Sequence, residues 1–266
     1  MQLPPITPSQ QQILFLMYRF RFLSRLHIQT ILSHKSPSPT KALLSDLTTK
    51  QYLTRIYIPT FPQNTQPARY FIGKHAIPYL KTMANVSQTQ LRKLYHEKNR
   101  SESFQIHCLS VADMYCNLLS HARKQKKELI FFSKADLHQE TVTDDMLFLR
   151  TLNPDGYYRY KGTGIAKQAC IEIVDATIPA FVLRRKLRKY ARNYQQRTWE
   201  ILHTKRFPSL LWIVPTEKKL NSVTYAIRKI RRECADEDLN ANFHCNIALR
   251  TDIQSKSIAD SIWEIA

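Results

Sequence analysis

The sequence predicts an α/β protein built of two parts: a helical N-terminal domain with a β-hairpin, then a larger α/β domain with a mixed central sheet. Residues 8–83 show apolar residues at helical spacing, interrupted by two β-rich runs, and residues 104–266 alternate helical and strand patterns. The chain has 266 residues, of which 43% are hydrophobic and 11% aromatic. That is enough apolar surface for a core in each part, which argues against disorder.

The basic residues are distributed unevenly. Lys and Arg number 40 against 21 Asp and Glu, a net charge of +19. The first 100 residues hold 14 basic and 2 acidic residues, whereas the remainder holds 26 and 19. A small, strongly basic N-terminal unit predicts a polyanionic partner, and nucleic acid is favoured. A membrane surface is disfavoured because no long basic amphipathic helix with a clean apolar face is present.

Cysteine usage and hydropathy indicate a cytoplasmic protein. The five cysteines are scattered without a C-x-x-C pair, so we expect reduced thiols rather than a disulfide framework or a zinc site. The longest apolar run, 13–18, is far too short to span a bilayer. Three prolines precede that run, which is not the pattern of a signal peptide.

Residues 1–83 have the element order of a winged helix. Caps at Thr7, Ser24 and Ser38 precede three apolar helical patterns, the first over 10–20. Two β-rich runs follow, 52–58 and 68–72, separated by a polar loop that suits a hairpin, and Gly73 leads into a fourth helix. In this helix-turn-helix variant the third helix enters the major groove of DNA. Residues 84–103 are polar and are expected to form a linker or a connecting helix.

Six side chains of this domain are predicted to contact double-stranded DNA. They lie on or near the third helix and on the wing: Lys41, Ser45, Thr48, Lys50, Arg55 and Arg69. Lys and Arg would hold phosphates, whereas Ser and Thr could reach the backbone or base edges. The alternative is a solvated basic helix without groove contacts.

Residues 104–266 predict the α/β domain. Helical patterns cover 104–124, a long segment from Pro179 to about 198, 217–232 and 255–263. Strand patterns cover 128–132, 146–149, 157–160, 168–174, 210–214 and 243–248, and a Lys161-Gly162-Thr163-Gly164 turn makes a hairpin of the third and fourth strands. This mixture predicts a mixed sheet with helices packed on it.

Two carboxylates of that hairpin are candidate metal ligands. Asp155 follows Pro154 at the start of one strand, and Glu172 lies inside an apolar run on the next. Facing side chains on antiparallel strands come within about 5 Å of each other. A pair of carboxylates could therefore hold Mg²⁺ or Mn²⁺, which activates water and neutralises charge on a scissile phosphate. Alternatively, Glu172 faces solvent or pairs with an arginine.

The helix after Glu172 carries a candidate cationic partner. Lys186 falls beside the apolar face formed by Leu183, Leu187, Tyr190 and Tyr194. It could reach back to the sheet and stabilise developing negative charge, or extend into solvent. The tyrosines near Asp155 could offer a nucleophile or stack on bases, although core packing is the commoner role of strand tyrosines: Tyr157, Tyr158 and Tyr160.

The chain resembles the replication-relaxation family of plasmid-associated proteins. The resemblance rests on the helix His107–Asp113, the Pro154-Asp155-Gly156 turn, the strand end Glu172–Thr177 and the segment Lys186–Tyr190. It implies an N-terminal winged helix followed by a PD-(D/E)xK, restriction-endonuclease-like domain. It also implies similarity to plasmid mobilisation relaxases that are thought to nick DNA through this fold.

The resemblance implies roles for individual residues. Asp155 and Glu172 would be metal ligands, Lys186 would replace the lysine of the motif, and Asp175 would be a supporting acid. The motif normally has lysine two residues after the second acid, where this chain has Val174. Two hypotheses follow: a metal-dependent nicking endonuclease acting at a plasmid origin, with a possible homodimer, or a non-catalytic replication initiator or transcription regulator with a degenerate nuclease-like domain.

Overall fold

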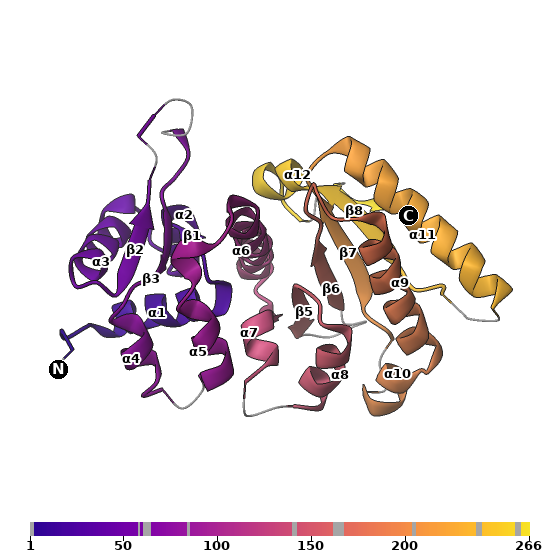
Figure 1. The fold of residues 1–266 in the computed structure, drawn as a ribbon, viewed down its shortest axis with the longest axis horizontal. Coiled ribbons are helices and arrows are strands. Elements are labelled where there is room, and N and C mark those ends of the chain that lie inside the picture. The colour runs from indigo at the N-terminus through magenta and orange to yellow at the C-terminus, as the bar shows by residue number, and fades with distance from the viewer. Residues whose placement is uncertain are drawn as a thin grey trace. The chain divides into compact units, whose positions relative to one another are not determined.

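The computed structural model describes residues 3–57, 59–60, 65–83, 86–139, 143–161, 168–203, 206–237, 241–258 and 262–266. The chain divides into two compact units: residues 1–116 with 138–141, and residues 117–137 with 142–266. The ribbon in Figure 1 is coloured from indigo through magenta for the first unit and toward yellow for the second.

The first unit has the element order expected from the sequence. Helix α1 (Pro8–Phe20), strand β1 (Leu23–Ser24), helices α2 (Arg25–Ile31) and α3 (Pro37–Thr49), and strands β2 (Leu53–Ile56) and β3 (Arg69–Ile72) follow one another. The strands form an antiparallel sheet in the order β1-β3-β2. This is the element order that the sequence predicts for a winged helix, and DNA contacts by α3 and the β2–β3 hairpin stay a prediction.

Helix caps explain where the first three helices begin. Thr7 and Gln10 form a capping box at α1, and Ser24 and His27 form one at α2. Helix α3 starts at Pro37, so its N-cap is Ser36, two residues before the cap predicted at Ser38. A proline suits the first helical position because its nitrogen has no proton to leave unpaired.

Residues 84–103 contain short helices where a linker or connecting helix was expected. Helix α4 (Ala76–Leu80) precedes them, and α5 (Gln88–Leu94) and the 3₁₀ helix η2 (Glu97–Asn99) lie within them. Leu91 and Leu94 are buried. Helix α6 (Glu102–Lys124) then runs without a break through residues that belong to both units. The boundaries predicted at residues 83 and 104 stay predictions.

The second unit is built on a sheet of six described strands in the order β4-β5-β6-β7-β8-β9. The strands are β4 (Glu128–Ser133), β5 (Gly156–Lys161), β6 (Gln168–Ile173), β7 (Ser209–Val214), β8 (Cys245–Leu249) and β9 (Glu264–Ile265). The pairs β6–β7 and β7–β8 are parallel, and the other three pairs are antiparallel. The mixed sheet predicted from the sequence is therefore confirmed.

Helices connect the parallel strands and cover one face of the sheet. Helices α9 (Ala180–Gln195) and α10 (Thr198–His203) join β6 to β7, and α11 (Glu217–Asp236) joins β7 to β8. Helices α9 and α11 lie side by side (Figure 1), and their buried side chains share one core with β5 to β8. Helices α7 (Lys134–Leu137), α8 (Asp144–Leu152) and α12 (Arg250–Ser255) complete the described part of this unit.

Two predicted elements of this unit are wrong. Residues 146–149, predicted as a strand, lie in helix α8, which Thr143 caps and in which the acids Asp144 and Asp145 occupy the first turn. The predicted last helix over 255–263 is absent from the described residues: α12 ends at Ser255 and strand β9 follows. Helix α9 covers the helix predicted from Pro179 to about 198, and α10 follows from Thr198.

The glycines of the predicted 161–164 turn lie outside the described residues. No helix in the described part of the chain combines the length and apolar character that a bilayer crossing requires.

Candidate functional site

Strand register brings the two predicted carboxylates together. Gly156 of β5 pairs with Ser133 of β4 and with Ile171 of β6. Asp155 lies one residue beyond this register, and its main-chain N–H donates to the carbonyl of Ile171. Its carboxylate accepts from the Ile173 N–H, pairs with Lys134 and interacts electrostatically with Glu172. We call these three residues the row Lys134–Asp155–Glu172.

The strands that carry this row are held by close packing. Every residue of β6 is buried, and β6 is paired with β5 and with β7. Gly156 begins β5 directly against β4, where a Cβ atom would lie 3.0 Å from Cζ of Phe131. A side chain at position 156 would therefore require the Phe131 ring to shift.

Asp155 is buried but held by two donors. Asp155 is 4% exposed. Oδ2 accepts a hydrogen bond of 2.7 Å from the main-chain N–H of Ile173, and Oδ1 is paired with the ammonium group of Lys134. The Lys134 side chain is 47% exposed, so the ion pair is open to solvent on the lysine side.

Glu172 is buried more deeply and points toward α9. It is 1% exposed, Oε1 accepts a hydrogen bond of 2.5 Å from the Tyr190 hydroxyl, and Oε2 is paired with Lys186. Burial raises the pKa of Glu172, and Lys186 opposes that rise. Burial disfavours the charged form of Lys186, but the charges of Glu172 and Asp155 outweigh it and raise the pKa of Lys186. The lysine is therefore an ammonium group at neutral pH.

Three of these groups, Asp155, Glu172 and Lys186, are predicted from the sequence, and two others are not. Glu172 neither faces solvent nor pairs with an arginine, and Lys186 reaches back to the sheet. Lys134 and Tyr190 were not predicted to take part. Lys134 directly follows the apolar strand β4, but only the β4–β5 register shows that it meets Asp155. Tyr190 was assigned to the apolar face of the helix, where it also lies.

Other sequence-predicted groups lie elsewhere. Asp175 is half-buried in the turn after β6, where its carbonyl accepts a hydrogen bond from Ile178, and Val174 belongs to the hydrophobic core. The three strand tyrosines are buried, and burial raises their pKa values, that of Tyr158 to about 12. The Tyr157 hydroxyl donates to Gln168 and that of Tyr160 to a main-chain carbonyl. Core packing is therefore their role.

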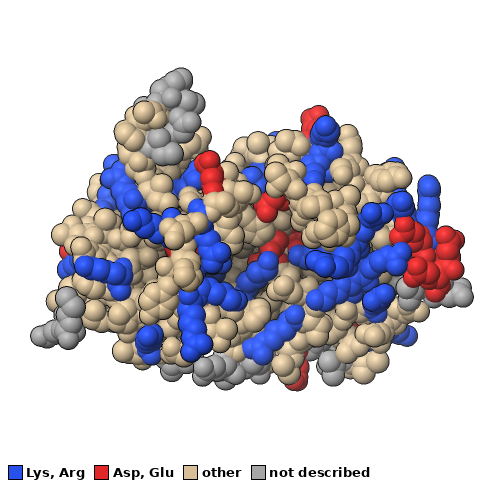
Figure 2. All heavy atoms as spheres, in the orientation of Figure 1, with Lys and Arg blue, Asp and Glu red and all other residues tan. Residues whose placement is uncertain are grey.

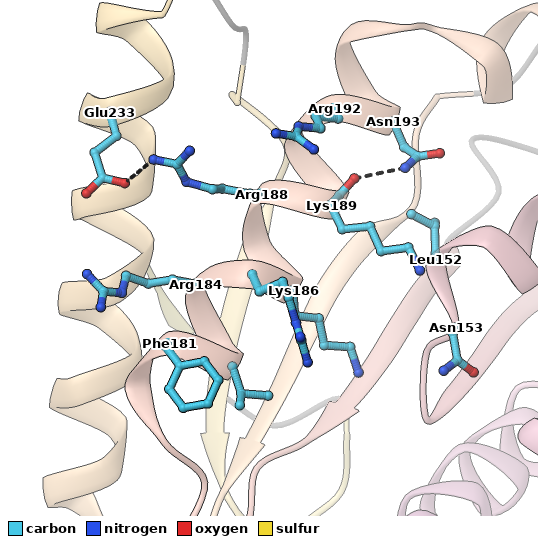
Figure 3. Close-up of a pocket in the computed structure, with 12 residues that line it drawn as sticks. Leu152, Asn153, Phe181, Arg184, Lys186, Arg188, Lys189, Arg192, Asn193 and Glu233 are labelled. Carbon is cyan, nitrogen blue, oxygen red and sulfur yellow. Dashed lines mark hydrogen bonds and ion pairs between the residues drawn. The ribbon is translucent and has the colours of Figure 1, made fainter.

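A basic pocket of about 880 Å³ lies along α9, and Lys186, which pairs with Glu172, is one of its lining residues. Six of its twelve lining residues are cationic and one is acidic (Figure 3): Arg184, Arg185, Lys186, Arg188, Lys189, Arg192 and Glu233. Figure 2 shows Lys and Arg gathered over the surface of α9. Arg188 pairs with Glu233 of α11 at 2.9 Å, whereas Arg185, Lys189 and Arg192 are exposed. Lys186 belongs both to this pocket and to the pair with Glu172.

In the first unit, the six predicted DNA contacts fall into two groups. Lys41, Ser45 and Arg55 are exposed. The others make contacts within the unit. The Thr48 hydroxyl donates to the carbonyl of Leu44, Lys50 pairs with Asp46 at 2.7 Å, and Arg69 pairs with Glu102 at 3.0 Å. Besides Pro37 and Pro39 in its first turn, α3 exposes one stripe of mostly small side chains: Ser38, Lys41, Ala42, Ser45 and Thr49.

The carboxylate pair fits a hard divalent cation. Mg²⁺ is commonly held by one or two carboxylates, with water and substrate phosphate supplying the remaining oxygen ligands. Asp155 and Glu172 provide two such groups, which interact electrostatically. Among the described residues no three Asp, Glu, His or Cys side chains gather around one point. A cation here would therefore displace lysine contacts and take water or phosphate oxygens besides the two carboxylates.

Comparisons with known proteins identify one family. The profile described as Replication-relaxation matches residues 14–210. No curated protein matches. The restriction endonuclease FokI bound to DNA is similar at 10% identity over 92% of this chain and 43% of that chain, with a TM-score of 0.32. FokI without DNA gives 8% identity over 92% and 42%, with a TM-score of 0.28. This chain spans less than half of FokI, and TM-scores this low do not establish a shared fold.

Proposed function

Because the chain belongs to the replication-relaxation family, we propose that it binds duplex DNA through its first unit and cuts one DNA strand through its second. The observation that carries the proposal is the row Lys134–Asp155–Glu172, completed by Lys186 from α9. Two buried carboxylates with two ammonium partners provide both cation ligands and positive charge at one place. The combination suits a negatively charged phosphodiester.

The first unit supplies recognition in this proposal. The exposed stripe of α3 lies where a winged helix meets the major groove, and its small side chains allow close approach to base edges. Lys41 and Arg55 are exposed and would hold phosphates. The excess of basic residues in the first 100 positions supplies a long-range attraction for DNA. A plasmid origin is the proposed target.

The second unit supplies the chemistry. Asp155 and Glu172 would hold Mg²⁺ or Mn²⁺, which activates water and neutralises charge on the scissile phosphate when bound. The Ile173 N–H fixes the orientation of Asp155, and Tyr190 and Lys186 fix that of Glu172. Lys186 also lines the basic pocket, so its ammonium group can stabilise the charge that builds up on phosphate oxygens.

A second candidate function is a non-catalytic replication initiator or transcription regulator. Two observations favour it. Val174 occupies the position of the motif lysine and is buried in the core. Both oxygens of each carboxylate already accept a hydrogen bond or an ion pair from the protein. In this alternative the two pairs are only structural: Glu172 with Lys186 joins β6 to α9, and Asp155 with Lys134 joins the start of β5 to α7.

A nicking assay on supercoiled plasmid carrying the cognate origin separates the two functions. We expect wild-type protein with Mg²⁺ or Mn²⁺ to convert supercoiled plasmid to the relaxed form, and a chelator to stop it. Asp155→Ala and Glu172→Ala should not relax the plasmid, whereas the control Asp236→Asn, an exposed acid on α11, should do so at the wild-type rate. Origin binding without relaxation by the wild type would favour the regulator.

A further inference from the structure

An exposed aromatic ring lies in the basic pocket beside α9. Phe181, in the first turn of that helix, is 59% exposed and lines the pocket. Figure 3 shows its ring at one end of the pocket, near Arg184. A single exposed aromatic residue is ordinary on a protein surface. This one, however, shares a pocket with six cationic side chains.

We propose that this pocket binds an unpaired segment of a DNA strand, with a base stacked on Phe181 and phosphates on Arg185 and Lys189. The proposal rests on the proposed function, because it names the form in which DNA would reach the second unit. Sites for single strands combine a cationic groove that follows the backbone with aromatic side chains on which bases stack. Both features are present in this pocket.

The aromatic ring favours an unpaired strand over a duplex. In a duplex the faces of the bases are covered by their neighbours, so an aromatic side chain has nothing to stack on unless the helix opens. A surface that bound only duplex phosphates would need the cations alone. Phe181 adds apolar area beside those cations, at a point where an unpaired base could cover it.

The pocket shares one residue with the carboxylate site. Lys186 lines the pocket and is paired with Glu172. On the opposite side the lining includes Asn153, which is exposed and lies two residues before Asp155. A phosphate that contacts Lys186 would therefore lie next to the proposed cation ligands. The strand held by the pocket would be the strand that is cut.

Fluorescence anisotropy tests the inference with the full chain and two probes, a labelled oligothymidine and a hairpin duplex of the same length. Phe181→Ala should weaken oligothymidine binding about tenfold, within the range for loss of one base–aromatic stack, and leave duplex binding unchanged. The matched control Tyr225→Ala removes a ring that is 67% exposed on α11 and should change neither. Replacing both Arg185 and Lys189 by Gln should lower the slope of log affinity against log salt by about 1.4, roughly 0.7 for each phosphate contact.

The inference is overturned if wild-type protein does not bind oligothymidine, or if Phe181→Ala binds it as tightly as wild type. Equal losses for oligothymidine and duplex would also overturn it, since they would indicate a duplex site. Asp155→Ala separates this inference from the cutting proposal, because it should retain oligothymidine binding. Binding that depends on Phe181 in a protein that does not nick would refute cutting alone. Nicking with binding independent of Phe181 would refute the pocket alone.

Discussion

Replacing Lys186 by methionine should show how much the ammonium group of the Glu172–Lys186 pair contributes to the stability of the fold. The substitution keeps an unbranched side chain that is one atom shorter and removes its charge. Glu172 is 1% exposed and the Lys186 side chain 25% exposed. Removing one partner of a buried pair leaves an uncompensated charge, which costs about 3–5 kcal/mol. Because a quarter of the lysine side chain is exposed, water can partly replace it, and we expect a loss of about 3 kcal/mol at neutral pH.

The loss should depend on pH, with a sign fixed by the carboxylate. Burial already raises the pKa of Glu172 above its ordinary value of 4.5, and the charge of Lys186 opposes that rise. Without Lys186 the folded-state pKa rises further, so the folded protein binds more protons than the unfolded chain between 4.5 and the raised value. Stability then falls as pH increases through that window. Lys186→Met should therefore be less destabilised at low pH, where Glu172 is protonated, than at neutral pH.

Urea unfolding followed by circular dichroism, at mildly acidic and at neutral pH, measures the stability lost in Lys186→Met. The double variant Glu172→Gln with Lys186→Met is the matched control, because it removes both charges and should lose much of the pH dependence. The reasoning is refuted if Lys186→Met costs the same at both pH values. It is also refuted if the cost at neutral pH is below about 1 kcal/mol, the range of an exposed surface pair.

Three other outcomes are expected. Tyr190→Phe leaves an oxygen of the buried Glu172 without its hydroxyl donor, so urea unfolding should show a loss of about 1–3 kcal/mol. Lys41→Ala should weaken origin binding in gel-shift assays and reduce the salt dependence of that binding. Lys50→Ala should change binding less, because the Lys50 ammonium group already pairs with Asp46. Gly73→Ala would place a Cβ atom 2.4 Å from a main-chain oxygen. Thermal unfolding should show a loss of about 1–3 kcal/mol, as for other overpacked sites.

The first unit could be predicted well because its signals are local. Caps, prolines and apolar spacing are properties of neighbouring residues, and they located α1, α2 and both wing strands. Strand β1 is two residues long and exists only because Leu23 and Ser24 pair with β3, far along the chain. Such a pairing has no local pattern in the sequence.

The errors in the second unit have the same origin. Met146–Leu149 is a short apolar run that suits a strand or a helix. The cap at Thr143 and the acids that follow it favour the helix, whereas the apolar run alone does not distinguish the two. At the end of the chain, the apolar residues near Ile262 suggested a helix, whereas β9 there is fixed by pairing with β8.

The sequence could identify the site residues that stand out within their own strand. Asp155 stands out by its place between proline and glycine, and Glu172 by its place in an apolar run. Their proximity follows from the hairpin. Lys134 and Tyr190 could not be assigned, because their contacts depend on the β4–β5 register and on how α9 packs over β6.

Binding of Mn²⁺, followed by electron paramagnetic resonance of the free ion, tests the central claim that Asp155 and Glu172 form a cation site. We expect wild-type protein to bind Mn²⁺ and both Asp155→Asn and Glu172→Gln to lose that binding, with Asp236→Asn as the control that retains it. Asp155→Asn keeps an oxygen that can accept from the Ile173 N–H, so its fold should persist and can be checked by circular dichroism. Equal Mn²⁺ binding by wild type and Asp155→Asn, or none by the wild type in the presence of DNA, would contradict the account.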